Sequence, residues 1–145
     1  MKNNKGFSLV ELIIVIAIMA VLVGVLAPTY LQYVEKSKKS NDVSTVDTIV
    51  NAVEIAAIDP VVVGTDTTTT LTIEVTTSGI TILPATGSKW KDAVLEAVGD
   101  AKLKSFTSVK FTATRDADTG KVTFAYDANV SQDFKDYAVQ ISKLQ

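Results

Sequence analysis

The segment Lys5-Gly6-Phe7-Ser8-Leu9-Val10-Glu11, followed by an aliphatic run from Leu12 to Val34, decides the fold of this chain. Glu11 is the only charged residue between Phe7 and Val34. At about 1.5 Å per residue, the uncharged part spans roughly 34 Å as a helix, which exceeds the bilayer hydrocarbon core of about 30 Å. The sequence therefore predicts one helix that can cross a membrane.

The flanks of this run predict its orientation and its fate. Lys2 and Lys5 precede it, and positive charge before a span keeps that end in the cytoplasm. A secretory signal has a shorter apolar region of about 7–15 residues, with a small-residue cleavage site behind it. No such site follows here, since Leu26-Ala27-Pro28-Thr29 leads directly into Tyr30-Leu31. We expect a retained anchor, with the rest of the chain outside the cell.

Composition excludes several classes of protein. The 145 residues include 14 Lys and Arg against 16 Asp and Glu, which gives a net charge of −2 and no basic field for nucleic acid. The chain has no Cys and no His, which excludes disulfides, thiolate nucleophiles, imidazole bases and metal sites built on either side chain. No nucleophile and base stand at a catalytic spacing. We therefore expect no enzyme activity, no catalytic residue, no cofactor, no bound metal and no specific nucleic acid.

The junction at the start of the run resembles the type IV pilin family, which includes the pseudopilins of type II secretion and competence systems. The shared features are a short basic leader ending in Gly6, then Phe7, then Ser8-Leu9-Val10-Glu11-Leu12, and an aliphatic helix to about Tyr33. The resemblance implies that a prepilin peptidase cuts between Gly6 and Phe7 on the cytoplasmic side and N-methylates the new Phe7 amine. The apolar helix would then begin the mature protein.

The same resemblance implies a structural function. The chain would be a subunit of a type IV pilus-like filament, first anchored in the cytoplasmic membrane and then displayed at the cell surface. Its partners would be copies of itself, the prepilin peptidase, an inner-membrane platform protein and an assembly ATPase, with motility, adhesion, DNA uptake or secretion as the output. Two alternatives remain open: a pseudopilin of a secretion or competence system, and a membrane-anchored surface binding domain that never assembles.

Glu11 is the residue of the span that most needs an explanation. A carboxylate inside an apolar membrane segment costs about 2.5–3.5 kcal/mol on insertion scales unless it is protonated or paired. Cleavage after Gly6 would create an amine on Phe7, and axially offset copies could pair it with the Glu11 of a neighbour. Such a pair fixes register, because breaking a buried pair costs about 3–5 kcal/mol. The alternative is a carboxylate at headgroup level, but the Gly-Phe-x-x-x-Glu context favours the assembly role.

Gly24 and Pro28 interrupt the aliphatic run and predict a kink. Pro28 has no N–H and its ring crowds the preceding turn, so the helical hydrogen bond to the Gly24 carbonyl must be lost. By resemblance, the pilin helix melts locally between such a glycine and proline when subunits pack in a filament. The alternative is a proline that the membrane helix tolerates without a further role.

The chain after the span divides into a stalk and a head. Residues 35–42 are polar on all sides and predict a solvated collar, and apolar residues at helical spacing then follow at Val43, Val46, Val50, Val53 and Ala57. Asp59-Pro60 should end the helix. We therefore predict a leader over 1–6, a helix over 7–59 (7–34 spanning the membrane or forming the filament core, 35–59 an amphipathic stalk) and a head over 60–145. The predicted class is α+β and pilin-like: a protruding N-terminal helix packed at its C-terminal half on a small head with an antiparallel sheet.

Alternation and turn residues predict the elements of the head. Strands are expected over 71–75, 80–83, 109–113 and 122–126, with a helix after Ser88 that turns Trp90, Val94, Ala97 and Val98 inward and ends at Gly99. Residues 131–144 fit a helix slightly better than a closing strand. The nine threonines from 65 to 81 are typical of strands and solvated loops, with O-glycosylation as the alternative.

Asp116, Asp118 and Asp127 raise the question of calcium. Asp-x-Asp-x-Gly resembles the opening of a calcium loop, but the loop is too short for an EF-hand and lacks the closing glutamate. Turn chemistry explains the same residues. We therefore expect a hairpin turn here and no metal.

Overall fold

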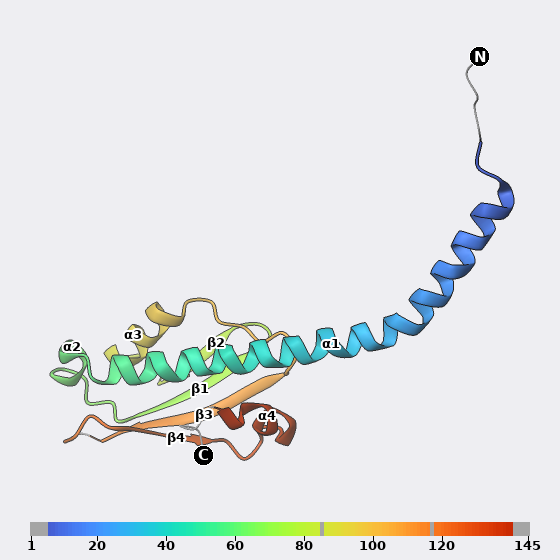
Figure 1. The fold of residues 1–145 in the computed structure, drawn as a ribbon. Helices are drawn as coiled ribbons and strands as arrows, with labels where there is room; N and C mark the ends of the chain where they lie inside the picture. The colour runs from blue at the N-terminus through green and yellow to red at the C-terminus, as the bar shows by residue number, and fades with distance from the viewer. Residues whose placement is uncertain (1–5, 85, 117, 141–145) are drawn as a thin grey trace. The chain divides into compact units, whose positions relative to one another are not determined.

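The computed structural model describes residues 6–84, 86–116 and 118–140, and the chain divides into two compact units, residues 1–36 and residues 37–145. We refer to these as the N-terminal unit and the head unit. One long helix, α1 (Leu9–Ala57), runs from the first into the second (Figure 1). A four-stranded antiparallel sheet follows it, so the α+β class predicted from the sequence is confirmed.

Helix α1 ends slightly before the predicted boundary at residue 59, because Asp59 begins another helix. The Asp59 carboxylate accepts a hydrogen bond of 2.7 Å from the Val61 N–H, which caps the short helix α2 (Pro60–Val63). Pro60 occupies the first turn of α2, where its missing N–H costs nothing. The sequence signal at Asp59-Pro60 therefore marks the end of one helix and the start of the next.

The head unit is built on strands β1 (Thr70–Thr76), β2 (Ile80–Leu83), β3 (Ser108–Arg115) and β4 (Val122–Tyr126). Their order across the sheet is β2-β1-β3-β4, and every neighbouring pair is antiparallel. The predicted hairpin of β3 with β4 is present, and β1 and β2 form a second one. Side chains along β1 and β3 alternate between the core and the outer face, as a sheet covered on one side requires.

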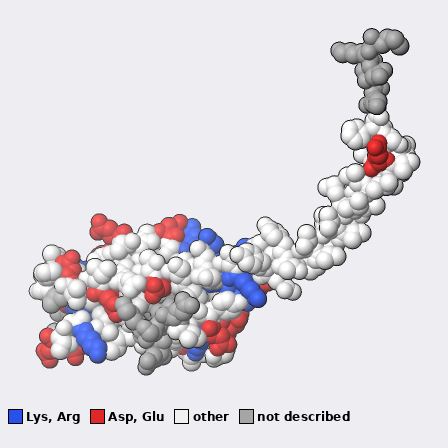
Figure 2. Space-filling view, in the orientation of Figure 1, with Lys and Arg blue, Asp and Glu red and all other residues white. Residues whose placement is uncertain are grey.

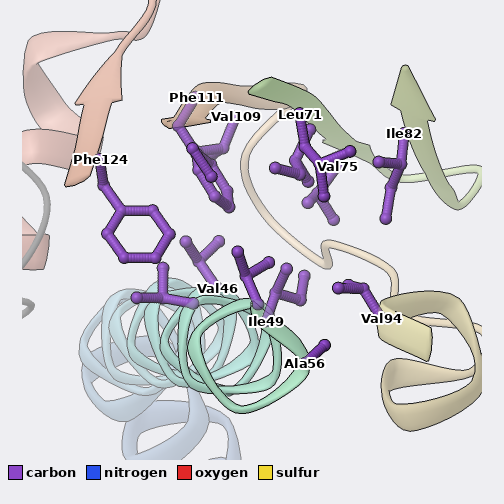
Figure 3. Packing of buried hydrophobic residues seen from close by; sticks show 14 of the residues in the cluster. Val46, Ile49, Ala56, Leu71, Val75, Ile82, Val94, Val109, Phe111 and Phe124 are labelled. Carbon is purple, nitrogen blue, oxygen red and sulfur yellow. The ribbon is translucent and has the colours of Figure 1, made fainter. Parts of the chain in front are cut away.

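The core lies between the sheet and the C-terminal half of α1. Figure 3 shows aliphatic side chains of α1 pointing toward those of the strands, with Val94 of α3 closing one side. Helical spacing predicted most of the α1 residues in this layer, since Val46, Val50, Val53 and Ala57 are buried and Val43 is half-buried. Ile49 and Ala56 are buried beside them. The amphipathic stalk is thus one wall of the head.

Helix α3 (Lys89–Val98) has the predicted ends. The Ser88 hydroxyl accepts a hydrogen bond of 3.1 Å from the Lys91 N–H, and Gly99 ends the helix with a positive φ of 58°. Trp90 and Val94 are fully buried. The prediction for Ala97 was wrong, because this residue is exposed.

Helix α4 (Gln132–Tyr137) resolves the alternative of helix or strand near the C-terminus in favour of the helix. Ser131 caps it, and it continues as one 3-10 turn, η1 (Ala138–Gln140). Phe134 packs edge-on against the Phe106 ring, with 5.0 Å between centroids. The remaining predicted helical residues, 141–144, lie outside the described residues.

Asp42 corrects the prediction of a solvated collar, because its carboxylate is fully buried in the head unit. One oxygen accepts a hydrogen bond of 2.7 Å from the Lys104 N–H, and the other accepts bonds of 2.7 and 3.0 Å from the Ser105 and Phe106 N–H groups. These three donors lie in the loop between α3 and β3. Asp42 therefore ties that loop to α1.

A second buried carboxylate, Asp66, fastens the start of α3. It accepts hydrogen bonds from the Ser88 hydroxyl (2.9 Å), the Trp90 N–H (2.7 Å) and the Thr68 N–H (2.8 Å). Burial by itself raises the pKa of Asp66, but these hydrogen bonds outweigh it and lower the pKa from 3.8 to about 2. The buried Arg115 guanidinium donates to the Asp66 carbonyl at 2.8 Å and stacks over the Trp90 ring at 5.3 Å.

Candidate functional site

The predicted cleavage junction lies outside any helix. Gly6, Phe7 and Ser8 have no regular secondary structure, and α1 begins only at Leu9. The Phe7 side chain is 92% exposed, and a Cβ atom on Gly6 would meet nothing within 4 Å. A protease needs an accessible chain outside a helix, and the Gly6–Phe7 bond lies in such a stretch.

Glu11 has a local role that the sequence reading missed. Its carboxylate accepts a hydrogen bond of 3.0 Å from the Ser8 N–H, one turn back, at the very start of α1. Ser-x-x-Glu before an apolar run is the signature of a capping box, so the pattern itself could have revealed this bond. The same carboxylate that is predicted to meet a neighbouring amine thus also anchors the start of its own helix.

The N-terminal unit presents apolar side chains on every side. The side chains from Phe7 to Tyr33 are all exposed, and the helix is long and apolar enough to cross a membrane, with a mean hydropathy of 3.1 in its most apolar window. In Figure 2 the exposed helix carries no charged atoms along the span apart from acidic ones close to its N-terminal end. No described residue of the chain covers the span, which requires either lipid or another protein around it.

Gly24 and Pro28 both lie within a continuous helix. Pro28 is inside α1, whose helical structure is not interrupted there. A Cβ atom on Gly24 would meet nothing within 4 Å, so packing within the chain does not require a glycine at this position. Melting of the helix between the two residues stays a prediction for the assembled state.

The N-terminal sequence itself matches a known pattern. Comparison with protein-family models aligns residues 1–27 with the prokaryotic N-terminal methylation motif. The chain carries the type IV prepilin signature. The same comparisons find no curated protein and no solved structure with significant similarity to the chain.

The prepilin signature confirms the family resemblance stated from Lys5 to Glu11 and supports a precursor of the type IV pilin or pseudopilin kind. The motif and the apolar helix together fit anchoring in a membrane before assembly. The signature covers the cleavage junction, the capping box and most of the span. The head unit lies outside it, so its surface must be interpreted from its own structure.

The acids considered for calcium form turns. The Asp116 carboxylate accepts hydrogen bonds from the Thr119 N–H and hydroxyl, both at 2.8 Å, and from the Asp118 N–H, and these bonds lower its pKa. Asp127 is bonded to Asn129 in the same manner, which lowers its pKa. Across residues 6–84, 86–116 and 118–140, no group of three acids is placed to hold a metal ion.

A groove in the head unit is a feature that sequence reasoning missed. It has a volume of about 510 Å³ and lies between the outer face of α1 and helix α3. Four of the residues that line it have small side chains, Ala52 and Ala56 from α1 with Ala93 and Ala97 from α3. The sequence had suggested otherwise, because Ala97 was expected to face the core.

Proposed function

We propose that this chain is the structural subunit of a type IV pilus-like filament. The observation that carries the proposal is the prepilin signature placed on a helix whose exposed side chains are apolar all round. Such a surface is stable in lipid and in a bundle of like helices, and unstable in water. The precursor is held in the membrane by this helix until copies of it pack together.

Processing precedes assembly in this proposal. The peptidase cuts the exposed Gly6–Phe7 bond on the cytoplasmic side and methylates the Phe7 amine, and the platform protein and assembly ATPase then add the subunit to the filament. The exposure of residues 6–8 and their lack of regular secondary structure support access of a protease to this bond. Mass spectrometry of protein sheared from the cell surface should find chains that begin at N-methylated Phe7. Recovery of chains that begin only at Met1 would contradict the processing step.

Glu11 sets the position of each added subunit. Since transfer from lipid to a helix bundle exchanges one apolar environment for another, the hydrophobic effect alone gives little direction to assembly. A carboxylate that meets the Phe7 amine of another copy gives the offset between them, because leaving one charge unpaired costs about 3–5 kcal/mol. Glu11→Gln keeps the shape and the acceptor oxygen toward Ser8 but removes the charge. We expect correctly processed Glu11→Gln chains to form few filaments, and normal yields with the normal subunit spacing would refute the pairing.

If the chain is instead a surface domain that never assembles, we expect the opposite results. Its leader would stay attached, and neither Gly6 nor Glu11 would affect its display at the surface. Electron microscopy of surface fibres then separates a pilus from the shorter filament of a secretion or competence pseudopilin.

A further inference from the structure

The C-terminal end of the apolar run in α1 differs from its middle. Aromatic residues between Phe7 and Val34 occur only at the two ends of the run, with Phe7 at one end and Tyr30 and Tyr33 at the other. The side chains of Tyr30 and Tyr33 are 67% and 72% exposed. A tyrosine has an apolar ring and a polar hydroxyl, so it is most stable where hydrocarbon meets the lipid headgroups. The two tyrosines therefore indicate where this boundary lies on the helix.

The axial positions of the tyrosines match the thickness of a bilayer. A rise of about 1.5 Å per residue places Tyr30 roughly 29 Å and Tyr33 roughly 33 Å from Glu11 along α1. If Glu11 lies at one boundary of a hydrocarbon core of about 30 Å, the two tyrosines lie on either side of the other boundary. Lys36 follows at roughly 38 Å, and a typical tilt of about 20° shortens this to roughly 35 Å along the membrane normal. Lys36 is therefore at the level of the headgroups.

Lys36 is the charged residue of the N-terminal unit that can bind lipid at this level. It is exposed and forms no hydrogen bond or ion pair with a described residue, whereas the adjacent Glu35 already has a partner in the chain. Lys38 carries a further exposed positive charge two positions along the helix. A lysine next to an apolar span extends its ammonium group into the polar layer, and positive charge at this level attracts anionic lipids.

We propose that Tyr30, Tyr33 and Lys36 form a binding surface for anionic phospholipid headgroups at the outer face of the membrane. We call this surface the interfacial anchor. The inference rests on the proposed function, in which a membrane holds the precursor before assembly, and adds the class of lipid and the residues that bind it. The Lys36 ammonium pairs with lipid phosphate, and the tyrosine rings hold the boundary. Because the anchor fixes the depth of α1, it also keeps the Gly6–Phe7 bond at the opposite membrane surface.

Retention of lipid by the full chain tests the anchor directly. The probe is a nanodisc of phosphatidylglycerol and phosphatidylcholine in equal parts, and native mass spectrometry counts the lipids that stay bound to the released protein. The unaltered chain should retain phosphatidylglycerol preferentially. Lys36→Gln should reduce that preference about fivefold, the effect of one charge near an anionic surface. The matched control is Lys121→Gln, which removes the same charge from an exposed residue between β3 and β4 and should leave the preference unchanged.

Labelling of an engineered cysteine tests the depth of the helix, because the natural chain has no Cys. Ser37→Cys lies one position after Lys36 and should react with a maleimide that cannot enter hydrocarbon. Tyr30→Leu together with Tyr33→Leu makes the end of the run wholly aliphatic, so more of the helix should enter the lipid. Labelling of Ser37→Cys should then slow several-fold. Labelling of Ser78→Cys, an exposed position between β1 and β2, is the control and should keep its rate.

The outcomes separate the anchor from the proposed function. A full chain that does not insert into nanodiscs contradicts the membrane-held precursor, whereas insertion without a preference for phosphatidylglycerol contradicts only the anchor. Equal lipid retention by Lys36→Gln and the unaltered chain would also overturn it, as would a preference that persists at high salt, where exposed charges are screened. An unchanged labelling rate of Ser37→Cys in the double tyrosine variant would refute the role of the two rings in setting the depth.

Discussion

Replacement of Asp42 by alanine should loosen the attachment of the α3–β3 loop to α1. The carboxylate is fully buried and accepts from three backbone N–H groups at 2.7, 2.7 and 3.0 Å. A buried donor left without an acceptor costs about 1–3 kcal/mol. Only the Phe106 bond is buried, and those of Lys104 and Ser105 are part-buried, so water should bring the total to the lower part of the summed range. We expect Asp42→Ala to lower the free energy of unfolding by about 3–5 kcal/mol, a large part of the roughly 5–15 kcal/mol that stabilises a domain.

The measurement is denaturant unfolding of the full chain in detergent micelles, followed by the fluorescence of Trp90. This is the only tryptophan of the chain and is fully buried in the head unit, so its emission reports unfolding of the head. Asp47→Ala is the matched control, since that half-buried acid on the same helix accepts a long 3.4 Å hydrogen bond from Asn51. The control should change stability by less than about 0.5 kcal/mol. Equal stability of the two variants would refute the structural role of Asp42.

Three further predictions concern other parts of the chain. The pKa of Asp66 is lowered from 3.8 to about 2 in the folded state. Its carboxylate therefore stabilises the head by about 2 kcal/mol above pH 3.8, and this stabilisation is lost as the pH falls through about 2. Unfolding measured against pH should show this loss, and an Asp66→Asn variant with the same acid dependence would argue against it. Trp90→Phe removes the indole N–H bond of 3.0 Å to the Val53 carbonyl and should cost at least about 1 kcal/mol by circular dichroism; an unchanged midpoint would show that the bond contributes nothing. Pro28→Ala restores a donor for the Gly24 carbonyl and should straighten α1, and unchanged distances between spin labels on either side of residue 28 would remove the predicted kink.

Local patterns made much of this fold predictable. The junction at Gly6-Phe7 and the capping acid lie within a few positions of one another, so their spacing is visible in the sequence. Helical periodicity likewise predicted that Val46, Val50 and Val53 face the sheet, and two-residue alternation predicted the strands. Each of these signals depends on neighbours in the chain.

Contacts between distant segments were not predictable in this way. Asp42 follows a run of polar residues, and nothing near it shows that the backbone at residues 104–106 will cover it. Arg115 continues the inward alternation of Val109, Phe111 and Ala113, but a cation at that position was not expected in the core. Ala97 was placed inward because alanine is apolar, whereas its small size leaves part of the groove open.

The bond between Ser8 and Glu11 bears on how easily a filament could be dismantled. In the separate subunit one oxygen of the acid already accepts from the Ser8 N–H, so the carboxylate is partly satisfied before a neighbour's amine approaches its other oxygen. Pairing with the amine therefore contributes less to polymer growth than it would for a carboxylate that had no donor at all in the separate subunit. Under the proposed function, a moderate pulling force or change in solution conditions could therefore shift the equilibrium between subunits in the membrane and subunits in the filament.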